Sequence, residues 1–132
     1  MSAIITISDD LRKKLADKAK DASHKSNLPQ SVGAAVMARN GTIYQGAWYE
    51  QSTGSAHRSA LSAALGNFLA SGGETVIAVA VYCPDGFEGP GDECRRLVKE
   101  FGNNIEFVSV FDNYIQTGAA TRNAIGSEDR AA

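Results

Sequence analysis

Blocks of apolar and polar residues along the chain predict an alternation of helices and strands. A first helix is predicted to begin after Ser8, because a serine can cap a helix start and leucines and alanines then recur at helical spacing. The apolar runs 32–37 and 43–48 predict two strands. Asn40-Gly41 between these runs is a strong signal for a tight turn, so the two strands are expected to form an antiparallel hairpin.

The second half of the chain continues the same alternation. Residues 56–69 predict an apolar helix, and residues 92–101 predict another. The run 76–82 shows no polar alternation, which is typical of a central strand covered on both faces. Residues 105–111 predict a fourth strand, and the weakly patterned tail is expected to form a short last helix at 119–125.

This order of elements predicts one α/β domain over residues 1–132, a three-layer α-β-α sandwich around a mixed sheet. A chain of this length can bury about two thirds of its unfolded surface. The net charge is −2 and both signs are interspersed, so neither nucleic acid nor a membrane is an expected partner. The first residues lack the features of a signal peptide, which favours a cytoplasmic protein.

Two short motifs carry the candidate chemistry, and each opens a predicted helix. The first is Thr-Gly-Ser-Ala-His-Arg-Ser-Ala-Leu at 53–61, and the second is Gly-Pro-Gly-Asp-Glu-Cys-Arg-Arg at 89–96. Together with Asn-Gly-x-Ile-Tyr-x-Gly at 40–46, they resemble the cytidine deaminase superfamily, in which blasticidin S deaminases are closest in length and spacing. In that family a His/Cys-Ala-Glu motif and a Pro-Cys-x-x-Cys motif hold a catalytic zinc. The resemblance implies a cytidine deaminase-like sandwich that acts on a small molecule.

The resemblance allows two registers of the first motif. In the first register His57 falls on the first zinc ligand, and Ser59 falls where the family has its catalytic glutamate. In the second register Ser-Ala-His-Arg at 55–58 aligns with Cys-Ala-Glu-Arg, so that His57 stands in for the glutamate. In the second motif Gly91 replaces a zinc ligand and Cys94 is retained as the third. Both registers therefore lack the glutamate and at least one ligand.

These substitutions predict a weakened metal site. A catalytic zinc normally needs three protein ligands and an open position, so no cofactor is expected unless Asp92 or Glu93 swings in as an oxygen ligand. Two ligands of one zinc lie about 3.5 Å apart, so without metal His57 and Cys94 would remain within hydrogen-bond reach. A thiol at a helix start ionises more readily, and such a pair can attack an electrophilic carbon.

Four further residues are candidates for binding the substrate. The resemblance aligns Glu50 with the acidic residue of an Asn-x-Glu motif that grips the sugar hydroxyls of nucleosides, whereas Trp48 takes the asparagine position. A tryptophan there would narrow the sugar site or make it apolar. Tyr49 can line the same cleft, and Arg58 can bind an anionic group of the substrate. Each also has a purely structural reading, as a solvated loop residue, a core residue or a surface ion pair.

Three hypotheses for function stay open at this point. The leading one is a small-molecule enzyme, of hydrolase or transferase type, that uses a metal-free pair of Cys94 and His57, with Ser59 nearby, in a biosynthetic pathway. The second is a catalytically silent binding or assembly subunit with a deaminase fold. The third is a residual zinc-dependent deaminase of a nucleoside or another amidine. The resemblance also implies a homo-oligomer, either a tetramer or a dimer.

Overall fold

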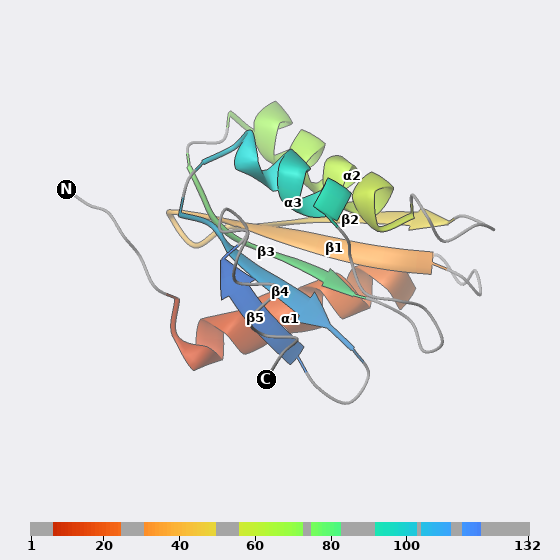
Figure 1. The fold of residues 1–132 in the computed structure, drawn as a ribbon, viewed down its shortest axis with the longest axis horizontal. Coiled ribbons are helices and arrows are strands. Elements are labelled where there is room, and N and C mark those ends of the chain that lie inside the picture. The colour runs from red at the N-terminus through yellow and green to blue at the C-terminus, as the bar shows by residue number, and fades with distance from the viewer. Residues whose placement is uncertain are drawn as a thin grey trace.

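The computed structural model describes residues 7–24, 31–49, 56–72, 75–82, 92–102, 104–111 and 115–119. In chain order its elements are α1 (Asp9–His24), β1 (Ser31–Ala38), β2 (Ile43–Tyr49), α2 (Ala56–Ala70), β3 (Val76–Tyr82), α3 (Asp92–Lys99), β4 (Glu106–Val110) and β5 (Ile115–Ala119). The described strands form one sheet in the order β2-β1-β3-β4-β5. Figure 1 shows α1 on one face of this sheet and α2 with α3 on the other. The predicted three-layer sandwich is confirmed.

Local signals in the first half of the chain act as predicted. The side-chain oxygen of Ser8 accepts a hydrogen bond from the backbone N–H of Leu11 at 3.1 Å, so Ser8 caps α1. In the turn between β1 and β2, Gly41 has a φ of 92°, a left-handed conformation that glycine adopts readily. The side chain of Asn40 accepts a hydrogen bond from the N–H of Thr42 at 3.0 Å. The antiparallel β1–β2 hairpin is therefore confirmed.

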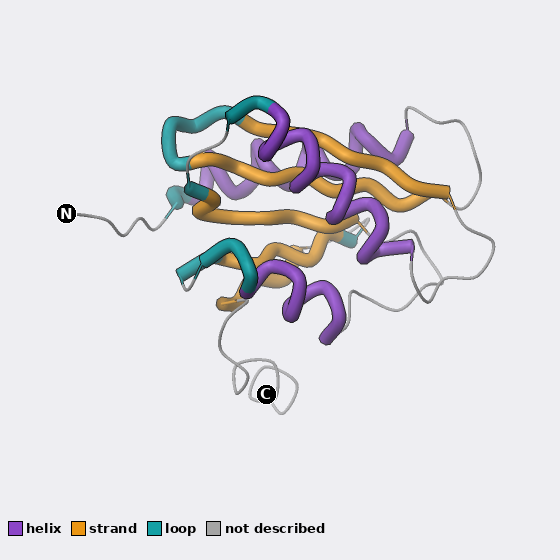
Figure 2. Tube along the Cα trace, turned by 90° about the horizontal axis from the view of Figure 1, so that it is seen from above, coloured by secondary structure: helices purple, strands orange, loops and turns teal. Residues whose placement is uncertain are grey.

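Strand direction decides where α2 and α3 lie. β1 pairs antiparallel with both β2 and β3, so β2 and β3 point the same way, and β4 pairs parallel with β3. The helices α2 and α3 therefore each connect two strands of the same direction, and both connections cross the sheet in the same sense. Because such crossovers are right-handed, both helices must cover the same face. Figures 1 and 2 show them there, side by side and running in the same direction.

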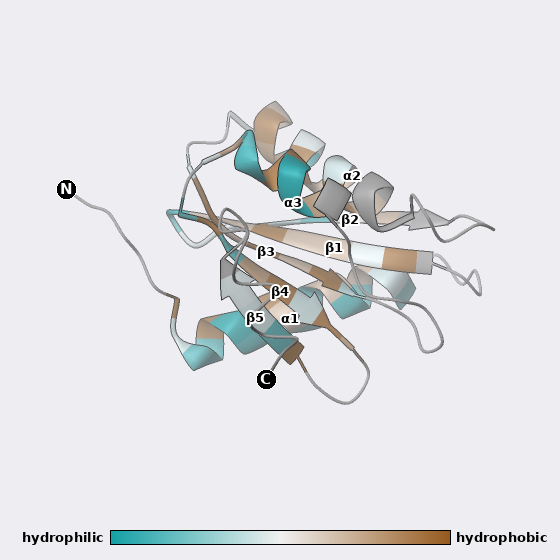
Figure 3. Ribbon diagram, in the orientation of Figure 1, coloured by the Kyte–Doolittle hydropathy of each residue, from teal (hydrophilic) through white to brown (hydrophobic). Residues whose placement is uncertain are grey.

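The buried apolar residues form two core layers, one on each face of the sheet. Figure 3 shows brown, hydrophobic segments along the central strands between these layers. The layer under α2 and α3 includes Phe68, Val98 and Phe107, and the layer under α1 includes Leu15 and Met37. The buried strand β3 contributes to both layers, as predicted for a central strand. None of the described helices is long and apolar enough to cross a membrane.

The tail differs from its prediction. A fifth strand, β5, pairs antiparallel with β4 over residues 115–119, so Ala119 belongs to a strand and not to the start of a helix. The rest of the predicted helix lies outside the described residues. The side chains of Ile115, Gln116 and Thr117 are exposed at this sheet edge. A short, exposed edge strand lacks the apolar alternation that marks a half-buried strand, so β5 has no clear signal in the residue pattern.

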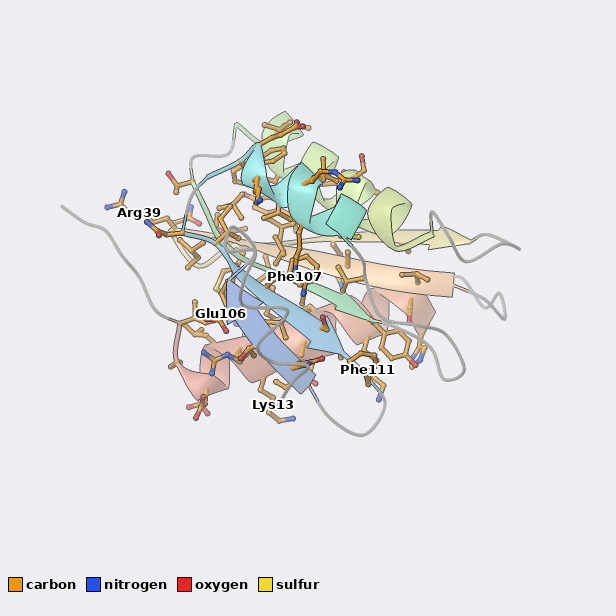
Figure 4. The ribbon with its side chains drawn as sticks, viewed as in Figure 1. Lys13, Arg39, Glu106, Phe107 and Phe111 are labelled. Carbon is orange, nitrogen blue, oxygen red and sulfur yellow. The ribbon has the colours of Figure 1, made fainter. Side chains whose placement is uncertain are left out.

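One ion pair ties α1 to β4 on the face opposite α2 and α3. The guanidinium of Arg12 donates from Nε to Oε2 of Glu106 at 2.6 Å and from Nη2 to Oε1 at 3.2 Å. The side chains are only 18% and 20% exposed, so this forked pair is largely shielded from water. The hydrogen bond to Glu106 raises the pKa of Arg12 above its ordinary value. Figure 4 shows Glu106 and its neighbour Phe107 pointing to opposite faces of β4.

We expect Arg12→Met to lower the free energy of unfolding by about 1–2 kcal/mol, because it leaves the partly buried carboxylate of Glu106 without its charged donor. The matched control is Lys13→Met on the same helix. Lys13 pairs with Asp17 at 3.6 Å through side chains that are 76% and 65% exposed, so its loss should cost less than about 0.5 kcal/mol. Urea unfolding followed by circular dichroism measures both values, and equal costs for the two variants would contradict the assignment.

Candidate active site

The starts of α2 and α3 define the candidate active site. Both helices follow strands of the same direction, and both begin toward the end of the sheet at which β2 and β3 finish (Figures 1 and 2). The first turn of a helix presents backbone N–H groups without intrahelical partners and the positive end of the helix dipole. Two such turns on one face create a region that favours negatively charged sulfur or oxygen atoms.

Cys94 stands in the first turn of α3, as its third residue. Its side chain is fully buried and belongs to the core layer under the two helices, together with Ala60 and Leu61 of α2. The sulfur is therefore held by tightly packed neighbours, and reagents in solvent have no direct access to it. A buried sulfur at a helix start fits either a metal ligand or a packing residue better than it fits an exposed nucleophile.

The first motif also opens its helix as predicted. His57, Arg58 and Ser59 are the second, third and fourth residues of α2, so their backbones form its first turn. Their side chains lie outside the described part of the structure, and the predicted roles of these three residues therefore remain predictions. The topology brings this turn to the same end of the sheet as the first turn of α3, which carries Cys94.

The candidate substrate residues come from the end of β2. Trp48 and Tyr49 are the last two residues of that strand and pair with Val32 and Ser31 of β1. The backbone thus places them at the end of the sheet toward which α2 begins, although their side chains are not described. Glu50 follows directly and lies outside the described residues. The binding roles of all three stay predictions.

Sequence reasoning missed the contact that anchors the start of α3. The guanidinium carbon of Arg95 lies 5.0 Å from the centre of the Phe107 ring on β4, a cation–π distance. Phe107 is almost completely buried, so the cation rests on a fixed surface. The residue next to Cys94 thereby ties the first turn of α3 to the sheet. The motif itself contains no signal for this contact, because Phe107 is far from Arg95 in the sequence.

The donor atoms at the two helix starts can be compared with the ligands that a zinc ion prefers. Sulfur of cysteine and nitrogen of histidine are the commonest protein ligands of zinc, and Cys94 and His57 supply one of each from neighbouring first turns. Among the side chains that the structure describes, no group of three or more metal-binding residues occurs. The side chains of His57, Asp92 and Glu93 are not in that set. By residue type alone, Cys94 and His57 match two ligand positions of the predicted site, and their roles as ligands stay predictions.

Comparison with known proteins shows which proteins have a similar sequence and fold. The chain is 34% identical over 94 residues to a cytidine deaminase from Sporosarcina psychrophila, which covers 68% of this chain and 69% of that relative. Its fold is similar to cytidine deaminase from Burkholderia pseudomallei, with a TM-score of 0.67, 26% identity, and coverage of 86% of this chain and 94% of the other. Cytidine deaminase from Mycobacterium tuberculosis gives a TM-score of 0.55 and 21% identity over 76% and 85% of the two chains. No family model matches the chain.

These relatives correct one expectation from the sequence. The expectation that the chain uses no cofactor is wrong, because the similar proteins are cytidine deaminases and enzymes of that class work with a bound zinc. Gly91 supplies no metal ligand, but this single position is a weaker guide to zinc use than the similarity of the whole chain. With a relative at this level of identity over most of its length, and with the same fold, the chain belongs to the cytidine deaminase family.

Proposed function

We propose that this chain is a zinc-dependent deaminase of a small nucleoside-like molecule or a related cyclic amidine. The observation that carries the proposal is the fully buried sulfur of Cys94 in the first turn of α3, beside the helix whose first turn carries His57. Membership of the cytidine deaminase family supports the reaction class. The similar fold supports one common site at the two helix starts.

Cys94 would hold the metal from a fixed position. Its side chain is fully buried in the same core cluster as Ala60 and Leu61, which leaves the sulfur little freedom, and the start of α3 would stabilise its negative charge. His57 would supply the nitrogen ligand in the first register. A zinc ion held there supplies Lewis-acid activation of water for attack on the ring carbon that bears the amino group. The third ligand would come from Asp92 or Glu93, or from the substrate itself.

Proton transfer separates the two registers of the first motif. The attack takes a proton from water, and the departing ammonia must receive one. A serine hydroxyl cannot exchange protons at neutral pH without a neighbouring base, so Ser59 in the glutamate position needs a further partner. A histidine changes its charge near neutral pH, so His57 in the glutamate position could perform both transfers itself. Whether His57 binds zinc or transfers protons therefore decides which residue carries the protons of the reaction.

The residues at the end of β2 favour a substrate other than an ordinary nucleoside. Trp48 replaces the asparagine that in the family grips a sugar hydroxyl, while Glu50 keeps the acidic position. A bulky ring there leaves less room for a ribose and more apolar surface for a modified group. Arg58 adds a positive charge for an anionic substituent. The proposal includes that the chain acts in a biosynthetic pathway and that it forms a homo-oligomer.

Protein purified with zinc should hold about one zinc ion per chain, and it should release ammonia faster from a cytidine analogue with a smaller sugar than from cytidine itself. Cys94→Ala should lose the zinc and the activity together, because it removes the described sulfur ligand. Val98→Ala is the matched control, since Val98 is equally buried on the same helix and its truncation should cost about 2 kcal/mol of stability without removing a donor. Zinc by mass spectrometry and ammonia release measure both variants. Full zinc content in Cys94→Ala would refute the site.

A pair of substitutions at His57 should separate the two registers. If His57 is a ligand, His57→Cys should keep zinc, because cysteine is the alternative ligand in the family, whereas His57→Ala should weaken zinc binding by at least about 100-fold. If His57 transfers protons, His57→Glu should keep activity, and His57→Ala should keep zinc while kcat falls by about 10²–10⁴-fold. Zinc titration and steady-state kinetics distinguish these patterns. Unchanged zinc affinity and unchanged kcat in His57→Ala would exclude both roles.

A further inference from the structure

Gly46 lies on β2 directly beneath α2, with no room for a side chain. A Cβ atom at this position would be 2.4 Å from the backbone nitrogen of Ala64, 2.6 Å from the carbonyl oxygen of Ala60 and 2.9 Å from the carbonyl carbon of Ala63. Ordinary contacts begin near 3.4 Å, so a methyl group would force the helix outward by about 1 Å. All three atoms belong to the helix backbone, so no side chain can rotate away to relieve the overlap.

Other contacts fix α2 along the same strand. The side-chain amide of Asn67 donates a hydrogen bond to the carbonyl oxygen of Gln45 at 2.7 Å. The rings of Tyr44 and Phe68 meet edge to face, with centres 5.7 Å apart. These contacts hold the second half of α2. Gly46 meets the helix backbone between Ala60 and Ala64, and Ala60 lies within the first motif, directly after Ser59. Of these three contacts, the close approach at Gly46 lies nearest in the chain to the predicted donors of α2.

We infer that Gly46 is a positioning residue for the active site. By allowing α2 to rest at this depth on β2, it sets where His57 and Ser59 stand relative to Cys94 on α3. The inference rests on the proposed function, since it concerns the geometry of that site. A displacement of reacting groups by about 1 Å can lower the rate of catalysis by about 100-fold. Gly46→Ala should therefore lower kcat by much more than a loss of stability alone would explain.

The opposite face of the sheet provides a matched control. Gly33 on β1 lies beneath α1 in the same way, because a Cβ there would be 2.0 Å from the carbonyl oxygen of Ala19 and 2.5 Å from the nitrogen of Ser23. Gly33→Ala is the same substitution with an even closer overlap. It displaces α1, which carries none of the proposed site residues. A general loss of packing should appear in both variants, whereas a loss of site geometry should appear only in Gly46→Ala.

A stabilised background keeps the comparison measurable. Gly66 lies on the exposed side of α2, and a Cβ there would meet nothing within 4 Å. Gly66→Ala should raise the melting temperature by about 3 °C, because alanine favours the helix, and it should leave the position of α2 unchanged. Gly46→Ala and Gly33→Ala are then each made in the Gly66→Ala protein.

The experiment compares deamination kinetics with melting temperature. We expect both double variants to melt lower than the background, kcat to fall by about 100-fold in Gly46→Ala, and kcat to stay within about threefold in Gly33→Ala. Equal loss of kcat in the two variants, or full activity in Gly46→Ala, would overturn the inference. If Gly46→Ala does not fold, Asn67→Ala replaces it, because it removes the hydrogen bond that holds α2 against Gln45 of the same strand. In this variant kcat should fall by more than in Gly33→Ala, and a kcat equal to that of the background would overturn the inference.

A second readout separates this inference from the proposed function. If the wild-type chain deaminates neither cytidine nor its analogues, the proposed substrate class fails, but the position of α2 can still be measured. Amide chemical shifts of residues 57–61 should change in Gly46→Ala and stay near their original values in Gly33→Ala. The absorption of Co²⁺ bound through the Cys94 sulfur should change in the same variant only. Unchanged amide shifts in Gly46→Ala would overturn the positioning role whatever the activity.

Discussion

The common direction of β2, β3 and β4 is the constraint on which the site depends. Each of the helices α2 and α3 must carry the chain back between two of these strands, and the right-handed crossover leaves only one face for both. Helices that return in the same direction begin at the same end of the sheet. Strand direction therefore brings the starts of two motifs that are distant in the sequence, one with His57 and one with Cys94, to the same end of the sheet.

Packing then turns this coarse placement into a defined geometry. On α2, the absence of a side chain at Gly46 lets the helix backbone rest against β2. On α3, the stacking of Arg95 over Phe107 fixes the first turn against β4. The same strand holds α1 from the other face through Glu106 and Arg12. The sheet thus acts as a rigid base that sets the depth of each helix.

The parts of the fold with strong local signals could be predicted from the sequence. The Asn40-Gly41 turn and the buried run of β3 were interpreted correctly, because turn chemistry and burial on both faces leave clear patterns. The strand β5 was missed, since an exposed edge strand has no such pattern. The close approach of α2 to Gly46 has one signal in the sequence. A glycine within an apolar strand often marks a place where another backbone comes close.

The candidate site was harder to predict than the fold. The start of each motif helix was predicted, but the burial of Cys94 depends on neighbours from other elements, which spacing does not reveal. The expectation of no cofactor was wrong because a single change such as Gly91 is a weaker guide to zinc use than the family relationship. The role of His57 depends on the length of the connection before α2, and a local pattern cannot determine that register.

Anomalous diffraction at the zinc absorption edge, from crystals of the zinc-loaded protein, tests the central claim most directly. The account predicts one strong peak between the first turns of α2 and α3, at about 2.3 Å from the sulfur of Cys94. A peak elsewhere in the molecule, or the absence of any peak near that sulfur in zinc-loaded crystals, would contradict it.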